Sequence, residues 1–295
     1  MTTPARYMPR TQVAAPVVAP RRYTLIGSIP EVPGDADGRW ERGVEYWSEA
    51  CNLKTGYVDG WCPPEDGAGD PTDWDIPIGP YEPVRVEAPP FTITSGIDCR
   101  SPVFPSQEKA EQALARGEDL QVERRFWAQQ MDREDLVELQ SGTTLALDQA
   151  IGVLEGEASQ RYSGLIYLHL PVQALVFLRE HALVERDGNL WRTAYGSVVV
   201  PGSGYVGGLG PAGAVPPADG WWALATGQPV MRRSPVFAQE AFDHRTNRRG
   251  AIAERTYVIS ADCLALAVRT APCGCTPTAP APITPSGSQA AGTEV

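Results

Sequence analysis

The sequence predicts an α+β fold, and three observations carry this prediction. Residues 163–269 alternate apolar runs with polar turns in the order strand, short helix and then several strands. Two segments before them repeat apolar residues at helical spacing. Apolar residues make up 42% of the 295-residue chain, which is enough to fill the core of one large domain or two small ones.

Irregular chain is expected near both ends, where many of the 29 Gly and 28 Pro residues gather. Residues 1–22 combine Pro with four arginines and show no period, so they predict an extended arm that is ordered only when something else holds it. Residues 34–90 are acidic and rich in Trp and Pro, which favours a loop-built subdomain. Residues 276–295 predict a flexible tail.

The chain from residue 91 to residue 142 predicts a strand, a helix and a hairpin. Residues 91–97 alternate apolar and polar side chains, as a half-buried strand does. Ser106 is expected to cap a short helix, and Gly117 to end it. Residues 118–142 fit either the two legs of a long hairpin or a second helix, and the hairpin is favoured.

A second helix is expected directly afterwards. Thr143 or Thr144 would cap it, and Leu147, Ile151 and Leu154 repeat at helical spacing within it. Two glycines in this segment lower its helix propensity without removing the pattern.

The C-terminal half predicts mainly strands. Residues 165–170 are apolar without alternation, as in a strand with both faces covered. Pro171 fits the first position of a helix that follows it. A turn at residues 187–189 separates that helix from the next strands. Strands are expected over residues 190–193 and 197–200, within 221–233, over 251–259 and over 263–269.

The charge balance argues against a general nucleic-acid binder and leaves room only for a smaller basic patch. The net charge is −11, whereas neutralising phosphates needs a surplus of Lys and Arg over a broad face. Nearly all positive charge is carried by Arg, which suits bidentate contacts at interfaces but also fits the codon bias of a GC-rich genome. The longest apolar run, residues 165–177, is too short to span a membrane. Because no export signal is evident, the six cysteines are expected to be free thiols.

No motif for catalysis, a metal or a cofactor stands out. Residues 202–207 fit G-x-G-x-x-G after a strand, but the Gly- and Pro-rich chain that follows cannot begin the helix that a nucleotide site needs. Cys273 and Cys275 lack the spacing and partners of a structural zinc site. His169 lies inside a strand and is expected to be a hydrogen-bonded core residue. We therefore expect no cofactor and no enzymatic activity.

Residues 122–127 mix charge with large aromatic side chains. Exposed, this composition is typical of an interface hot spot, since Arg and Trp contribute most when a partner desolvates them. The alternative is an amphipathic segment that packs on its own core. The candidate inter-subunit contacts are Arg124, Arg125, Phe126 and Trp127, together with Arg21 and Arg22 of the arm.

The order of elements from 107 to 269 resembles the major capsid proteins of tailed phages that share the Hong Kong 97-type fold, which encapsulin shells also use. Three stretches carry the resemblance: GLIYLHLPVQALVFLREHAL (164–183), LWRTAYGSVVV (190–200) and TNRRGAIAERTYVISADCLALAV (246–268). They are patterns rather than invariant motifs.

The resemblance implies a domain organisation with an extended N-terminal arm, an extended loop hairpin, a spine helix, and peripheral and axial domains. The implied parts are an arm (1–33), a Pro- and Trp-rich subdomain with a strand (34–105), a short helix (106–117), the extended loop (118–142), the spine helix and peripheral domain (143–200), the axial region (201–233), closing strands of the peripheral domain (234–270) and a tail (271–295).

The resemblance also implies a function. It predicts a major capsid protein that assembles in the cytoplasm of a bacterial host into pentamers and hexamers of an icosahedral head. The shell would enclose double-stranded DNA without sequence-specific contacts, and portal, scaffold or decoration proteins are possible partners. The alternatives are an encapsulin-like shell around a cargo enzyme, and a phage tail or decoration protein.

Overall fold

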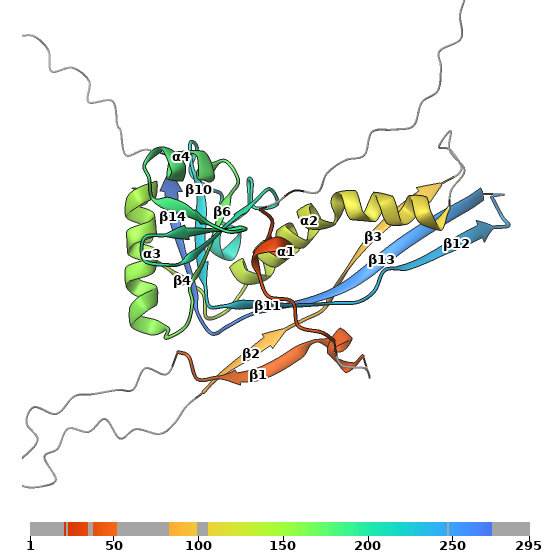
Figure 1. The fold of residues 1–295 in the computed structure, drawn as a ribbon, viewed down its shortest axis with the longest axis horizontal. Helices are drawn as coiled ribbons and strands as arrows, with labels where there is room; N and C mark the ends of the chain where they lie inside the picture. Colours follow the sequence, from red (N-terminus) through yellow and green to blue (C-terminus); the bar gives the residue numbers. More distant parts are fainter. Residues whose placement is uncertain are drawn as a thin grey trace, which may run out of the picture.

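The computed structural model describes residues 21, 23–34, 38–51, 83–98, 106–246 and 248–272. Within them the chain forms two β-sheets and a separate β-hairpin, as Figure 1 shows. One end of the elongated molecule holds an eight-stranded sheet with helices α3 (Leu147–Arg161) and α4 (Ala174–Glu180). A longer sheet extends from it to the other end, alongside helix α2 (Gln107–Met131).

The eight-stranded sheet has mixed topology. Its order is β4-β14-β10-β6-β9-β8-β7, and β5 also pairs with β14. Strands β6 and β9 are parallel, whereas β10 is antiparallel to both of its neighbours, β6 and β14. The strands are β4 (Val137–Glu138), β5 (Thr144–Ala146), β6 (Tyr167–Pro171), β7 (Val184–Asp187), β8 (Leu190–Thr193), β9 (Val198–Gly202), β10 (Trp221–Thr226) and β14 (Ala265–Ala271).

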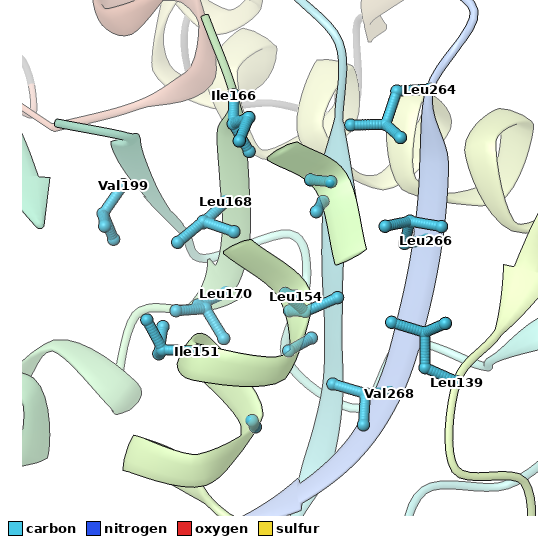
Figure 2. Packing of buried hydrophobic residues seen from close by; sticks show 14 of the residues in the cluster. Leu139, Ile151, Leu154, Ile166, Leu168, Leu170, Val199, Leu264, Leu266 and Val268 are labelled. Atoms are coloured by element: carbon cyan, nitrogen blue, oxygen red, sulfur yellow. The ribbon is translucent and has the colours of Figure 1, made fainter. Parts of the chain in front are cut away.

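Both faces of this sheet are covered, which explains why every residue of β6, β9 and β10 is buried. On one face, Ile151 and Leu154 of α3 lie against Leu168, Leu170 and Val268, as Figure 2 shows. On the other face, alternate strand residues pack against α2 and the short helix α1 (Leu25–Ser28). The apolar run without alternation at β6 is therefore the expected signature of a doubly covered strand, and that prediction is confirmed.

The longer sheet is built around β13 (Arg248–Ala261). Strands β11 (Pro229–Arg233) and β12 (Phe237–Asp243) pair with one edge of β13, and β3 (Phe91–Asp98) pairs with the other. Ala110 and Leu114 of α2 pack against Ala251 and Ala253 on one face. The hairpin of β1 (Val44–Ser48) and β2 (Val84–Ala88) lies beside this sheet, and two 3₁₀ turns complete the described elements, η1 (Arg39–Arg42) and η2 (Pro211–Gly213).

Helix α2 corrects two predictions. The helix begins after Ser106, whose side chain accepts a hydrogen bond from the Lys109 amide, so the predicted cap is confirmed. It does not end at Gly117, and residues 118–131 continue it instead of forming an extended hairpin. The reason is tertiary: Val122 and Phe126, one turn apart, are fully buried, and this burial outweighs the roughly 1 kcal/mol that a mid-helix glycine costs. The longest described helix is thus α2.

Several smaller predictions are decided as well. The strand at 91–97 and those of the C-terminal half are confirmed within a few residues. The predicted threonine cap is wrong, because Thr144 begins β5 and the N-cap position of α3 is Ala146. Pro171 ends β6 and does not open α4. The turn at 187–189 joins β7 to β8, so it connects two strands.

The sheet pairing also divides the chain differently from the predicted domains. Residues 143–200 and 234–270 were expected in one domain and 201–233 in another. Instead, β10 lies between β6 and β14, while β11 pairs with β13 in the longer sheet. Strands β13 and β14, expected together, belong to different sheets. The chain crosses between the sheets three times, so neither sheet is a continuous stretch of sequence.

The described N-terminal residues are also more folded than expected. Leu25 and Ile29 are buried against α2 and β9, so residues 23–29 pack on their own chain and are not a free arm. Part of the predicted loop-built subdomain is the β1–β2 hairpin, although residues 52–82 lie outside the described structure. Residues 1–20 and residues 273–295 of the predicted tail also lie outside it, whereas Ala271 ends β14. None of the described helices is long and apolar enough to cross a membrane.

Candidate assembly surfaces and the junction between the sheets

The predicted aromatic contacts lie inside the molecule. Phe126 is fully buried and Trp127 is 3% exposed, and both belong to the core between α2 and the eight-stranded sheet. The indole N–H of Trp127 donates to the carbonyl oxygen of Leu209 at 2.8 Å. The prediction of Phe126 and Trp127 as inter-subunit contacts is therefore corrected, and the alternative interpretation of this segment, packing on its own core, describes these residues.

Arg124 and Arg125 lie on the opposite, exposed side of α2. Both line a shallow groove with Phe91 and Ile93 of β3. Arg125 also lines a second groove, together with Glu87 and other residues of the β2 end. Arg21 is exposed at the start of the described chain, and Arg22 lies outside the described residues.

Glu123 points inward from α2 and is 1% exposed. Its carboxylate accepts hydrogen bonds from the Gly204 amide at 2.8 Å and from the Leu25 amide at 3.3 Å. Burial raises the pKa of Glu123, while the two amide hydrogen bonds act in the opposite direction. One carboxylate thus joins α2, the first turn of α1 and the loop after β9.

Close packing accounts for two of the three glycines of the G-x-G-x-x-G stretch. A Cβ on Gly204 would lie 2.5 Å from the Cβ of Glu123, and a Cβ on Gly202 would lie 2.5 Å from the ring of Tyr205. These two positions therefore need glycine for close packing. The stretch is followed by the short turn η2, in line with the prediction that no helix begins there.

His169 is a core residue, as predicted from its place in a strand. Its Nε2 lies 2.9 Å from the Thr226 hydroxyl, and its Nδ1 lies 3.3 Å from the Tyr205 hydroxyl. Complete burial lowers the pKa of His169 to about 3, so the ring is neutral at physiological pH. Within the described residues no group of three or more His, Cys, Asp or Glu side chains could hold a metal ion.

The loop between β9 and β10 exposes three large apolar side chains at the eight-stranded end. Val206, Leu209 and Val215 are 50%, 52% and 74% exposed. Their backbone is held in place, because Trp127 donates to the Leu209 carbonyl and the Trp222 indole donates to the Ala214 carbonyl at 3.2 Å. Residues 202–218 contain no charged side chain. A fixed, uncharged and apolar loop has the character of a contact surface.

A polar junction holds the two sheets together. Arg133 follows α2, and its guanidinium donates to the carbonyl oxygens of Asp262 at 3.0 Å and Cys263 at 3.3 Å, in the turn between β13 and β14. The Tyr162 hydroxyl accepts from the Gln228 amide at 3.0 Å, in the turn between β10 and β11. Burial raises the pKa of Tyr162 to about 12, so the hydroxyl stays protonated.

A disulfide bond lies at the same junction. Cys51, just after β1, is bonded to Cys263, with 6.1 Å between their Cα atoms. The expectation of free thiols is therefore wrong for these two residues, and the other four cysteines lie outside the described structure. The pairing spans 212 residues, so spacing along the sequence gave no signal for it.

Comparison of the sequence with known protein families finds no matching family model, and no curated protein matches. Solved structures do match. The capsid protein of cyanophage Pam1 is 11% identical, with a TM-score of 0.52, over 93% of this chain and 99% of that one. The chain has the fold of a capsid protein. The capsid of the native GTA particle matches with a TM-score of 0.50 at 11% identity, over 91% of this chain and 96% of that one.

These likenesses confirm the predicted fold class, a mixed helix and sheet fold shared with phage capsid proteins. They cover more than nine tenths of each chain. The encapsulin of the holo-SrpI complex from Synechococcus elongatus PCC 7942 also matches, with a TM-score of 0.45 at 10% identity over 88% of this chain and 92% of that one.

Proposed function

We propose that this chain is the major capsid protein of a tailed bacteriophage, which assembles into pentamers and hexamers of an icosahedral head around double-stranded DNA. The observation that carries the proposal is the fold shared with the Pam1 capsid protein over 99% of that chain. A fold alone does not fix a function, so the surfaces of this chain supply the second line of support. The role is structural, and the proposal includes no catalytic step.

The uncharged loop between β9 and β10 is the proposed contact between copies around a symmetry axis. Identical chains that each carry a net charge of −11 repel one another, and the repulsion is weakest where a surface has no charge. Val206, Leu209 and Val215 offer apolar area at such a surface. Because the two indole hydrogen bonds already fix the backbone, little conformational entropy is lost when the loop is buried.

Arg124, Arg125 and Arg21 are the proposed contacts to carboxylates of a neighbouring copy. All three are exposed, and an exposed guanidinium can bind a carboxylate through two parallel hydrogen bonds. Packaged DNA would be held without sequence-specific contact, consistent with the acidic charge of the chain. Assembly would take place in the cytoplasm of a bacterial host, with portal, scaffold or decoration proteins as further partners.

The test is to express the chain alone and together with the proteins encoded beside its gene, and to measure the mass and shape of the product by light scattering and electron microscopy. We expect closed, icosahedral particles of megadalton mass in at least one of the two preparations. A chain that stays monomeric, or forms only small rings, in both preparations would contradict the proposal. Rings or trimers that bind preformed heads would instead identify a tail or decoration protein.

The contents of the particles separate a phage head from a cargo shell. Particles taken from cells that carry the complete phage genome are treated with nuclease and then opened. The proposal expects protected double-stranded DNA of uniform length. Particles without DNA that contain one folded enzyme would identify an encapsulin-like compartment.

A further inference from the structure

The Cys51–Cys263 disulfide joins the β1–β2 hairpin to the turn between the two sheets. Cys51 lies three residues after the end of β1, and Cys263 lies in the turn where the chain passes from β13 in one sheet to β14 in the other. The bond therefore adds a covalent connection between the β1–β2 hairpin and the junction of the two sheets. Without it, the hairpin is held by the buried side chains of Val86 and Ala88 and by hydrogen bonds from the amide and hydroxyl of Ser163 to the Ala50 carbonyl, at 2.9 and 3.3 Å.

The two sulfur atoms have different surroundings. Cys51 is partly exposed, whereas Cys263 is 8% exposed. The hydroxyl of Ser48, itself buried, donates to the Sγ of Cys263 at 3.3 Å. The same hydroxyl oxygen accepts from the Ala50 amide at 3.3 Å, which orients it. A hydrogen-bond donor at one sulfur stabilises that sulfur as a thiolate, so this sulfur is the better leaving group.

We propose that this pair is a thiol-exchange site at which the disulfide reversibly locks the β1–β2 hairpin to the body of the protein, with Cys51 as the attacked sulfur and Cys263 as the leaving sulfur. The reactants are small thiols and dithiols in the reducing direction, and small disulfides in the oxidising direction. Ser48 acts as a positioning residue through its hydrogen bond to the leaving sulfur.

The exchange balances as two displacements. A thiolate of a dithiol attacks the Sγ of Cys51, the S–S bond breaks, and its electron pair leaves on the Sγ of Cys263. The second thiolate of the reagent then attacks the mixed disulfide, closes the reagent's own disulfide ring and releases Cys51. The two protons lost by the dithiol are taken up by the two protein thiolates. In reverse, two protein thiols reduce a small disulfide to two thiols.

Whether the thiol exchange forms or breaks the disulfide depends on the redox conditions around the protein. A protein made in a reducing cytoplasm holds thiols, and a protein released into an oxidising medium forms disulfides. This consequence rests on the proposed function, in which the chain is made in a bacterial cell and released in a virion. The bond would then form after assembly and add a covalent connection to a hairpin that packing and hydrogen bonds alone had held before.

The first test follows the bond itself. The full-length chain is incubated with dithiothreitol or with oxidised glutathione, quenched with N-ethylmaleimide and digested for mass spectrometry. We expect a peptide linking Cys51 to Cys263 after oxidation and its loss after reduction. Ser48→Ala should slow reduction by about threefold to tenfold, because the donor to the leaving sulfur is gone. Ser159→Ala, at an exposed serine of α3, is the matched control and should reduce at the wild-type rate.

The second test follows the hairpin. Amide hydrogen exchange over β1 and β2 should be at least about tenfold faster in the reduced protein than in the oxidised protein. Cys51→Ser should show the fast exchange under both conditions, whereas Cys99→Ser should behave as wild type. Failure to form the 51–263 peptide under oxidation, or equal hairpin exchange in both states, would overturn the proposal.

These measurements are made on dissociated chains, so they are separate from the assembly assay. If particles form but hairpin exchange is the same in the oxidised and reduced protein, the capsid function is supported and the thiol-exchange proposal is wrong. If hairpin exchange depends on the redox state but the chain never assembles, the thiol-exchange proposal is supported and the capsid function is wrong.

Discussion

At the scale of single residues, Glu123 binds two segments that are distant in the sequence and holds them in place. Its buried carboxylate holds the first turn of α1 and the loop after β9 against α2. The sequence placed Glu123 in a segment that fitted either an exposed interface or packing on its own core. The signal for packing on its own core was the pair of apolar residues around it, Val122 and Phe126, one helical turn apart. A buried carboxylate that accepts backbone amides from two distant segments cannot be predicted without knowing the contacts of the fold.

Glu123→Gln tests this contact. The amide can accept one of the two hydrogen bonds, but its N–H₂ then faces a backbone N–H, so we expect a loss of about 1–3 kcal/mol in the free energy of unfolding. Denaturant titration measures it. Glu108→Gln, on the exposed first turn of α2, is the matched control and should change stability by less than about 0.5 kcal/mol.

The difference in stability between the wild type and Glu123→Gln should depend on pH, and the direction of this dependence follows from the pKa of Glu123. The pKa of Glu123 is raised above its ordinary value of 4.5, so the folded state binds more protons than the unfolded state between the two values. Stability contributed by Glu123 therefore falls as pH rises from about 4.5 through the folded-state pKa, and is constant above it. The wild-type advantage over Glu123→Gln should be larger on the acid side. An advantage that grows with pH would contradict the burial of this group.

At the scale of elements, helix α2 shows where sequence patterns are reliable and where they are not. The Ser106 cap was readable because it depends on local hydrogen bonding. The continuation through Gly117 was not, because it depends on the sheets that bury Val122 and Phe126. Likewise, the strands were predicted from their own residues, but their division between two sheets follows from long-range pairing.

Gly117→Ala should stabilise the protein. A Cβ at Gly117 would meet no atom within 4 Å, and alanine has a higher helix propensity by about 0.5–1 kcal/mol. The midpoint of denaturant unfolding should therefore rise by a corresponding amount. Were the chain to turn into a hairpin after Gly117, as the sequence suggested, alanine would bring no such gain.

The loop between β9 and β10 allows a prediction about assembly. Val215 is 74% exposed, so Val215→Asp should leave the fold intact, as judged by circular dichroism and the unfolding midpoint. A carboxylate there places like charges together where copies meet, and particle formation should fall at least about tenfold. Val176→Asp is the control, because Val176 is 66% exposed on α4, away from the loop. Equal assembly of the two variants would show that the loop is not a contact.

At the scale of the whole molecule, two sheets are joined into one elongated body. The chain passes between the sheets three times, and the Arg133 and Tyr162 hydrogen bonds and the Cys51–Cys263 bond connect the segments at their junction. The sequence predicted the fold class and its capsid-like order, because these are carried by contiguous strands and helices. The disulfide could not be predicted, since residues 212 apart become neighbours only when both sheets have formed.

The mass of the native particle tests the central claim most directly. Light scattering and electron microscopy of the chain, expressed alone and with the proteins encoded beside it, should show closed icosahedral shells of megadalton mass. A monodisperse monomer of 31.8 kDa in both preparations would contradict the account.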